Sequence, residues 1–174
     1  VDVDPARVPL LGRSAGGHLA LLAASAPDDP ALPPSCDAGD TSVARVISFY
    51  GPTDLAWAWD HPTNPRVFDL RGRVTSYTGA TPDAEPARYR LLSPMDRATA
   101  ASPPTLLLQG GRDAFVPAEN AERLARRLAE VGVPYDVLLV PYAQHAFDFI
   151  SGGLGAQLAE RAVLQFLQPL GAHP

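Results

Sequence analysis

The chain has 174 residues, of which 46% are hydrophobic and 19% are charged, a composition that fits a globular domain able to bury a core. Its formal net charge is −5 and no segment concentrates basic residues, which argues against a nucleic-acid-binding protein. The single cysteine, Cys36, excludes an internal disulfide and a cysteine-rich metal cluster. The longest apolar run, residues 19–24, is too short to cross a bilayer, and no targeting segment is visible.

Short strand-like runs alternate with longer helix-like runs along the chain, and this order predicts an α/β fold. Residues 43–50 alternate too little for a one-sided strand, which indicates a strand buried on both faces. Right-handed crossovers would place the four strands parallel in one sheet with helices on its faces. In chain order the expected elements are a strand at 7–11, a helix at 14–26, strands at 43–50 and 105–109, a helix from Pro117 to just before Gly132, a strand at 135–140 and a helix at 154–167.

The stretch of residues 57–101 has weak periodicity, and five prolines interrupt any long helix within it. Only short helical turns are expected there, near residues 67–77 and 84–92. We therefore interpret residues 57–101 as a cap-like insertion rather than as a layer of the core.

The first predicted strand runs directly into Gly12-Arg13-Ser14-Ala15-Gly16, a match to G-x-S-x-G. A strand before this motif and a helix after it form the context that a nucleophile elbow requires. The two flanking glycines would let the strained turn pack closely while the serine hydroxyl stands clear. The backbone N–H of Ala15 is then expected to donate to a developing oxyanion. The alternative is that Ser14 is an ordinary helix N-cap.

A serine nucleophile needs a base, and the chain offers four histidines. His18 lies one turn after Ser14 on the same predicted helix and is expected to point into packing or solvent. His61 falls in the irregular segment, and His173 falls in the C-terminal tail. His145 follows the fourth strand, at the carboxyl edge of the sheet where ligands gather in open α/β folds, and it is the predicted base.

The base in turn needs a carboxylate to orient it. Asp113 follows the third strand in a loop that two glycines allow to turn sharply, and we predict it as the acid. Asp54, after the second strand, competes for this role, although its surroundings suit a turn or a helix cap. Asp148 is too near His145 in sequence to reach its ring easily, and we interpret it as structural. The order Ser14, Asp113, His145 is that of α/β-hydrolases.

With these motifs, the sequence resembles the carboxylesterase and lipase branch of the α/β-hydrolases, including hormone-sensitive-lipase-like and feruloyl-esterase-like members, and most of all actinobacterial hydrolases. The resemblance implies Ser14 as nucleophile, Asp113 as acid, His145 as base and Ala15 as one oxyanion donor. It also implies a small-molecule ester substrate and no metal or cofactor. The segments that carry the resemblance are LGRSAGGHLALLAA (11–24), SFYGPTDL (48–55), LLLQGGRDAFVP (106–117) and VPYAQHAFDF (140–149).

One departure from the family pattern concerns the position of the nucleophile. The family's sheet has eight strands with the nucleophile after the fifth, whereas Ser14 here follows the first predicted strand. We therefore expect residues 1–174 to be the C-terminal part of one α/β-hydrolase domain, without the N-terminal strands and the His-Gly-Gly-Gly-type oxyanion loop. Such a fragment alone is expected to be inactive. A native polypeptide mass near 18.4 kDa would contradict the expectation that the chain is part of a longer protein.

These features together predict a serine hydrolase that cleaves carboxylic esters through an acyl-enzyme. Aromatic residues near the site are candidates for an acyl or aryl pocket, or else for a small satellite core. An amide hydrolase, aminopeptidase-like or arylformamidase-like, would use the same triad, and a non-catalytic binding module can share the same fold. The candidate pocket residues are Tyr50, Trp57, Trp59, Phe115 and Phe147, and the cap-like insertion also offers His61, Phe68 and Tyr77.

Overall fold

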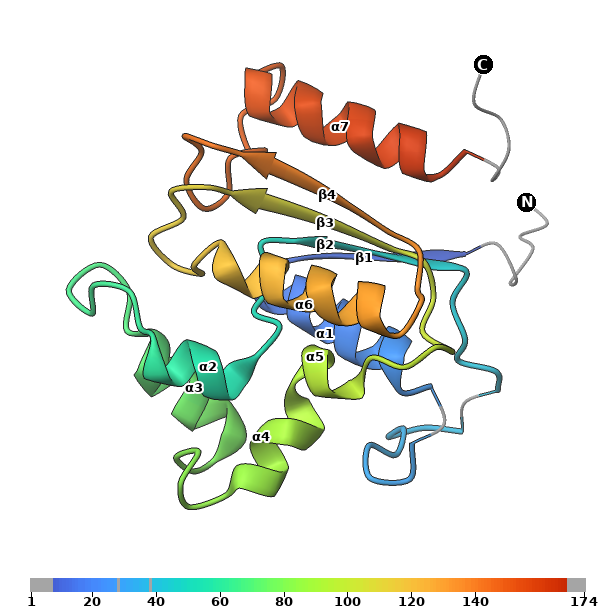
Figure 1. Cartoon of the computed structure of the whole chain (residues 1–174), viewed down its shortest axis with the longest axis vertical. Helices are drawn as coiled ribbons and strands as arrows, with labels where there is room; N and C mark the ends of the chain where they lie inside the picture. Colours follow the sequence, from blue (N-terminus) through green and yellow to red (C-terminus); the bar gives the residue numbers. More distant parts are fainter. Residues whose placement is uncertain (1–7, 28, 38, 169–174) are drawn as a thin grey trace.

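The computed structural model describes residues 8–27, 29–37 and 39–168, and it contains one four-stranded parallel sheet. The strands lie side by side in chain order, which confirms the predicted α/β fold with its four parallel strands (Figure 1). Arg7, predicted to begin the first strand, lies outside the described residues. The strands are β1 (Pro9–Arg13), β2 (Arg45–Phe49), β3 (Thr105–Gly110) and β4 (Tyr135–Val140).

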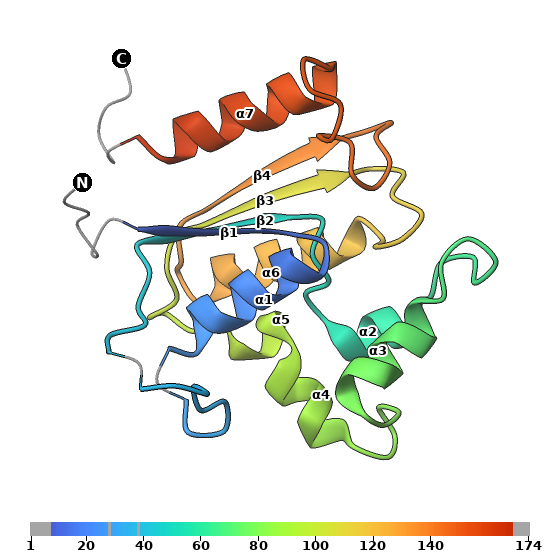
Figure 2. The ribbon, with the colours of Figure 1, turned by 180° about the vertical axis from the view of Figure 1, so that it is seen from behind.

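Helices cover both faces of the sheet. Figures 1 and 2 show α1 (Ala15–Ser25) and α6 (Glu119–Glu130) on one face and α7 (Leu154–Phe166) on the other. Successive side chains of the inner strands alternate between two apolar clusters, as the geometry of a β-strand requires. In β3, for example, Leu107 packs toward α1 and α6, whereas Leu106 and Leu108 pack toward α7.

The segment between β2 and β3 contains four short helices rather than the two helical turns expected. They are α2 (Leu55–Asp60), α3 (Leu70–Thr78), α4 (Pro86–Leu92) and α5 (Pro94–Arg97). Helices α2, α3 and α4 share a small apolar core of their own, which includes Leu55, Leu70 and Tyr89. The short α5 instead packs against α1 and α6, and Ala98 just after it belongs to the main core.

Asp54 begins α2 and ties this segment to α6. Its carboxylate accepts a hydrogen bond from the backbone N–H of Trp57, the contact expected of an N-cap. The other carboxylate oxygen lies 2.6 Å from Nη2 of Arg123 on α6. Asp54 is thus a helix cap paired with an arginine, as the surroundings of this residue suggested.

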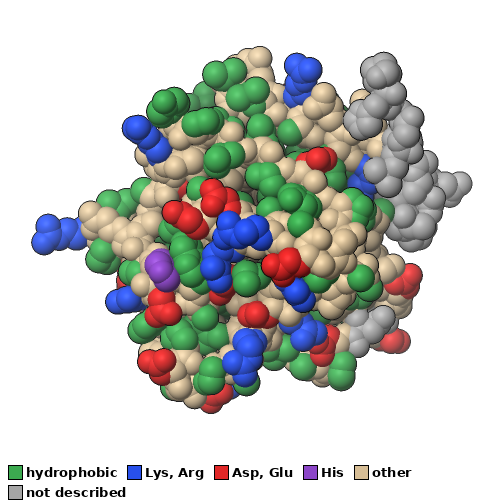
Figure 3. All heavy atoms as spheres, viewed as in Figure 1, with side chains coloured by type: hydrophobic (Ala, Val, Ile, Leu, Met, Phe, Trp, Pro, Cys, Tyr) green, Lys and Arg blue, Asp and Glu red, His purple; other side chains and the backbone are tan. Residues whose placement is uncertain are grey.

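Charges of both signs are interspersed on the face seen in Figure 3, over the helices that cover it. None of the helices in the described residues has the length and apolar character that crossing a membrane would require.

Candidate active site

Ser14 occupies a strained turn between β1 and α1. Its φ of 53° and ψ of −123° lie outside the regions that L-residues normally adopt. The turn is held because the backbone N–H of Ser14 donates to the carbonyl of Phe49, at 2.8 Å. The Ser14 side chain makes no capping hydrogen bond to α1. The hydroxyl therefore stands clear of the helix, which argues against the N-cap alternative.

The glycines around Ser14 differ in whether a larger side chain would fit at their positions. A Cβ on Gly12 would lie 2.0 Å from the carbonyl oxygen of Gly16, so only glycine fits there. A Cβ on Gly16 would meet none of the described atoms within 4 Å, which differs from the expected need for small side chains at both flanking positions. The second close approach is instead at Gly17, where a Cβ would lie 2.7 Å from the hydroxyl of Ser48.

The structure brings Ser14, His145 and Asp113 into one hydrogen-bonded chain. The Ser14 hydroxyl lies 3.0 Å from Nε2 of His145, and Nδ1 of the same ring lies 2.7 Å from Oδ2 of Asp113. A carboxylate only accepts, so Nδ1 carries a hydrogen and Nε2 is left to accept from the serine hydroxyl. The three residues follow β1, β4 and β3, at the carboxyl edge of the sheet.

Asp113 is fixed from several directions. Its side chain is fully buried, whereas 12% of the His145 side chain is exposed. Oδ1 of Asp113 accepts from the backbone N–H groups of Phe115 and Val116, at 2.8 and 2.9 Å. The amide of Gln109 donates to Oδ2 at 3.2 Å. These donors satisfy the buried carboxylate and aim one of its oxygens at His145. Sequence reasoning missed Gln109, whose only signal was a polar residue in an otherwise apolar strand.

Neither His18 nor His61 belongs to this hydrogen-bonded chain. His18 is buried; its Nδ1 donates to the carbonyl of Pro52 at 3.0 Å, and the Tyr77 hydroxyl lies 3.4 Å from Nε2. Burial lowers the pKa of His18, although the hydrogen bond to Pro52 acts in the opposite direction. His61 is exposed at the end of α2, and His173 lies outside the described residues.

The backbone N–H of Ala15 is the first amide of α1. Across residues 8–27, 29–37 and 39–168 it donates to no recorded hydrogen-bond acceptor. An unused amide at the start of a helix is suited to stabilising negative charge. This observation fits the oxyanion role expected for Ala15.

A cavity of about 230 Å³ opens beside Ser14, between α1 and the helical segment that follows β2. Its wall is mostly apolar, and Arg73 supplies the one arginine. The cavity is lined by Ser14, Ala15, His18, Leu19, Pro52, Leu55, Phe68, Leu70, Arg73, Val74, Tyr77 and Val116.

Of the aromatic residues expected to form the pocket, Phe68 and Tyr77 line this cavity, whereas the others do not. The Tyr50 and Phe115 rings contact His145, with centroids 4.4 and 4.9 Å from that of the imidazole, and Phe147 packs against Tyr50. Trp57 stacks on the His61 ring, and Nε1 of Trp59 donates to Thr75. Neither tryptophan lines the cavity, which α2 reaches through Leu55.

Comparison with known proteins relates the chain to esterases and other hydrolases. A family model described as BD-FAE matches residues 1–128. Over 94% of its length, the chain is 34% identical to the probable carboxylic ester hydrolase LipM of Mycobacterium tuberculosis. The match covers 37% of LipM, so the chain spans little more than a third of that relative.

Two solved structures share the fold. A thermophilic esterase, Est2, from the Planctomycetes species Thermogutta terrifontis superposes with a TM-score of 0.74 at 25% identity, over 97% of this chain and 57% of Est2. A puromycin-hydrolyzing peptidase of Mycobacterium tuberculosis gives 0.73 at 29% identity, over 99% of this chain and 23% of the peptidase. The parallel sheet, the elbow at Ser14 and the family match agree, and the chain belongs to the BD-FAE family of α/β-hydrolases.

Proposed function

We propose that the protein hydrolyses small-molecule carboxylic esters, with Ser14 as nucleophile, His145 as base and Asp113 as the acid that orients the base. The observation that carries this proposal is the continuous chain from the Ser14 hydroxyl to His145 Nε2 and from Nδ1 to Asp113, at 3.0 and 2.7 Å. The strained backbone of Ser14 and the cavity beside its hydroxyl support the same assignment.

In the first half-reaction, Ser14 Oγ forms a bond to the ester carbonyl carbon while its proton passes to Nε2 of His145. The carbonyl oxygen becomes an oxyanion, to which the N–H of Ala15 donates. The tetrahedral intermediate then collapses, the bond to the alcohol oxygen breaks, and His145 returns its proton to the leaving alcohol. An acyl group remains on Ser14.

In the second half-reaction, water attacks the acyl-enzyme and gives a proton to His145. The bond between Ser14 Oγ and the acyl carbon breaks, the proton returns to Oγ, and the carboxylic acid leaves. Asp113 stabilises the imidazolium that forms in each step, because its buried carboxylate accepts from Nδ1.

One amide donor at Ala15 is fewer than an oxyanion hole normally uses, and losing one donor costs about 100- to 1000-fold in rate. The relative LipM is longer than this chain. We propose that a second donor lies in a part of the domain that such relatives add, and that residues 1–174 form the C-terminal part of this domain. The natural protein should then have a mass well above 18.4 kDa.

The decisive experiment compares wild-type protein, at its natural full length, with Ser14→Ala on p-nitrophenyl acetate. The variant should lose turnover, and a fluorophosphonate probe should label the wild type at Ser14 but leave the variant unlabelled. Turnover that persists in Ser14→Ala would contradict the assignment.

Amide hydrolysis is a second candidate, since a puromycin-hydrolyzing peptidase shares the fold at 29% identity. The same three residues can cleave an amide if His145 protonates the departing amine. Rates on a matched pair of substrates, an aryl ester and the corresponding aryl amide, distinguish ester hydrolysis from amide hydrolysis. We expect the ester to be preferred, and a preference for the amide would favour amide hydrolysis as the function.

A further inference from the structure

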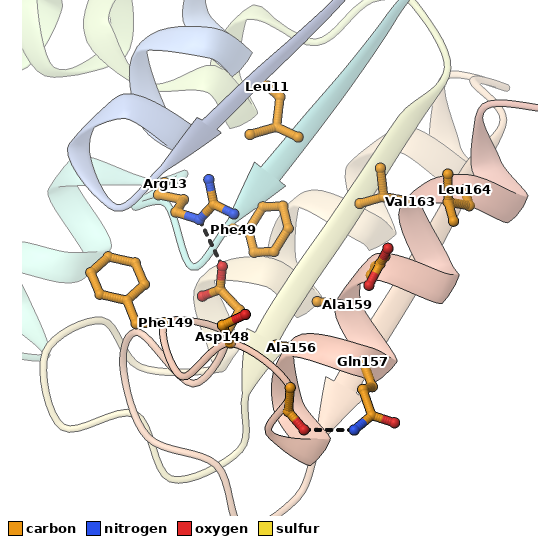
Figure 4. A pocket seen from close by; sticks show the side chains of 13 residues that line it. Leu11, Arg13, Phe49, Asp148, Phe149, Ala156, Gln157, Ala159, Val163 and Leu164 are labelled. Atoms are coloured by element: carbon orange, nitrogen blue, oxygen red, sulfur yellow. Dashed lines mark hydrogen bonds and ion pairs between the residues drawn. The ribbon is translucent and has the colours of Figure 1, made fainter.

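Arg13, directly before the nucleophile, forms an ion pair with a residue of the loop that carries His145. Its Nε donates to Oδ2 of Asp148 at 2.7 Å, and its guanidinium lies 4.6 Å from the centre of the Phe49 ring. Figure 4 shows Arg13 reaching the Asp148 carboxylate beside the ring of Phe49. Phe49 is also the residue whose carbonyl accepts the N–H of Ser14. Arg13 thus connects the nucleophile elbow, the end of β2 and the His145 loop.

Asp148 needs these partners because its side chain is only 3% exposed, whereas that of Arg13 is 46% exposed. Its other oxygen, Oδ1, accepts from the Tyr50 hydroxyl at 2.7 Å. Each carboxylate oxygen therefore has a donor. Removing the arginine would leave a buried negative charge without its cation, which is a costly arrangement.

Tyr50 extends this network to the imidazole. Its ring centroid lies 4.4 Å from that of His145, and its backbone N–H donates to the carbonyl of Leu108 at 2.7 Å. The backbone of Tyr50 has a positive φ of 42°, an unusual conformation for a bulky residue. Burial, together with the hydrogen bond to Asp148, raises the pKa of Tyr50, so the hydroxyl stays protonated and keeps donating at neutral pH.

The His145 loop itself contains backbone strain that such contacts can hold. Ala146, next to His145, has a φ of 60°, and its carbonyl accepts from the N–H of Phe149 at 3.1 Å. Asp148 lies within this turn. Fixing Asp148 from β1 and from Tyr50 therefore fixes the turn that carries the base.

We propose that Arg13, Asp148 and Tyr50 are positioning residues that hold His145 in register with Ser14. The proposal rests on the proposed function of His145 as the base. Arg13 does not line the cavity beside Ser14, so it does not contact a substrate bound there. Its loss should accordingly affect kcat more than KM.

The test uses the protein at its natural full length and p-nitrophenyl acetate as substrate. Arg13→Met should lower kcat about 10- to 100-fold, the scale expected when a catalytic group is misplaced by roughly 1 Å. KM should stay within about twofold of the wild-type value. Arg13→Lys, which retains the charge, should recover most of kcat, and Tyr50→Phe, which retains the ring, should show a smaller fall than Arg13→Met.

The matched control is Arg45→Met. Arg45 lies 5.4 Å from the centre of the Phe166 ring and has no recorded carboxylate partner among the described residues, so its variant loses a similar cation–π contact without an ion pair. Its kcat should match the wild type. Melting temperatures of all variants are measured in parallel, and if Arg13→Met fails to fold, Tyr50→Phe decides the question.

The proposal is overturned if Arg13→Met retains the wild-type kcat. If Arg13→Met does not fold, a wild-type kcat in Tyr50→Phe overturns it instead. A fall in kcat in Arg45→Met equal to that in Arg13→Met also overturns it. The proposal is likewise overturned if Arg13→Met lowers kcat and Arg13→Lys, with an unchanged melting temperature, does not restore it. In these cases Ser14→Ala still loses turnover and the proposed function stands. If wild type and Ser14→Ala are indistinguishable, the proposed function fails, and the positioning role fails with it.

Discussion

Gly12 and Gly16 cross so closely that a Cβ on Gly12 would lie 2.0 Å from the Gly16 carbonyl oxygen. The contact is with backbone, which cannot rotate away as a side chain could. It brings the end of β1 against the first turn of α1 and leaves Ser14 at the apex of the turn between them.

This contact predicts that Gly12→Ala destabilises the protein by about 3 kcal/mol, the scale of a forced overpacking. Because Ser14 must move with the turn, kcat on p-nitrophenyl acetate should fall as well. Urea unfolding and steady-state kinetics measure the two effects. Gly16→Ala is the matched control, since nothing described lies within 4 Å of the added carbon, and it should gain up to about 1 kcal/mol from the lost flexibility of glycine.

Asp113 and Asp54 offer a test of which carboxylate orients the base. Asp113→Asn should lower kcat by about 10⁴-fold, because an amide there favours the wrong tautomer of His145. Asp54→Asn should leave kcat unchanged, because Asp54 caps α2 and pairs with Arg123 instead. Its effect should be limited to stability, at roughly 1 kcal/mol or less, because asparagine also caps helices well.

Comparable activity losses in the two aspartate variants would contradict this assignment. Circular dichroism at the assay temperature ensures that both proteins are folded when kcat is compared.

The cavity beside Ser14 predicts a dependence on acyl chain length that a single substitution can change. Leu19 lines this cavity and is 52% exposed, so Leu19→Trp should fold while narrowing the space. The variant should lower kcat/KM for p-nitrophenyl octanoate about tenfold relative to the acetate. Leu164→Trp, at a similarly exposed position on α7, should leave this ratio unchanged. An unchanged ratio in Leu19→Trp would show that the acyl chain binds elsewhere.

The burial of His18 predicts how the stability of the folded protein depends on pH. Burial lowers its pKa in the folded protein, so the unfolded chain binds a proton more readily than the folded chain does. In the unfolded chain the pKa of this histidine is about 6.5. The contribution of His18 to the free energy of unfolding is therefore complete above that pH and is lost as the pH falls through the lower pKa of the folded protein. Melting temperatures measured between pH 7.5 and pH 4.5 should drop less in His18→Gln than in the wild type. His61→Gln, at an exposed position, is the matched control.

Much of the sheet was predictable because its strands are short, apolar and bounded by glycine or proline. Residues 135–140 were predicted as a strand and form β4 without any shift. β1 extends to Arg13, past the predicted end at residue 11, because the strand continues into the elbow, where a glycine and a charged residue interrupt the hydrophobic pattern.

The helices α2 and α5 were missed for a physical reason. Each is only a turn or so long, and α5 begins at Pro94 in a proline-rich stretch where local propensity disfavours helix. Tertiary contacts hold them instead: Arg123 pairs with Asp54 at the start of α2, and the Ser93 hydroxyl accepts from the N–H of Leu55. Such bonds join residues far apart in the chain and have no signature in a single sequence.

The grouping of Ser14, Asp113 and His145 was predictable because each follows a strand that ends at the same edge of a parallel sheet. The surroundings of these residues were harder to predict. Which aromatic rings face the cavity depends on the rotation of α2 and α3, and the bond between Arg13 and Asp148 joins positions 135 residues apart.

Ser14 and His145 lie 131 residues apart, with all four strands needed to bring them together. Contacts of such wide separation form only after the chain has closed a long loop, which slows folding. During refolding, ester hydrolysis should therefore return only after β4 has docked on β3. Helical signal from α1 and α6 can recover earlier. For this protein, an activity assay would also report on the completion of folding.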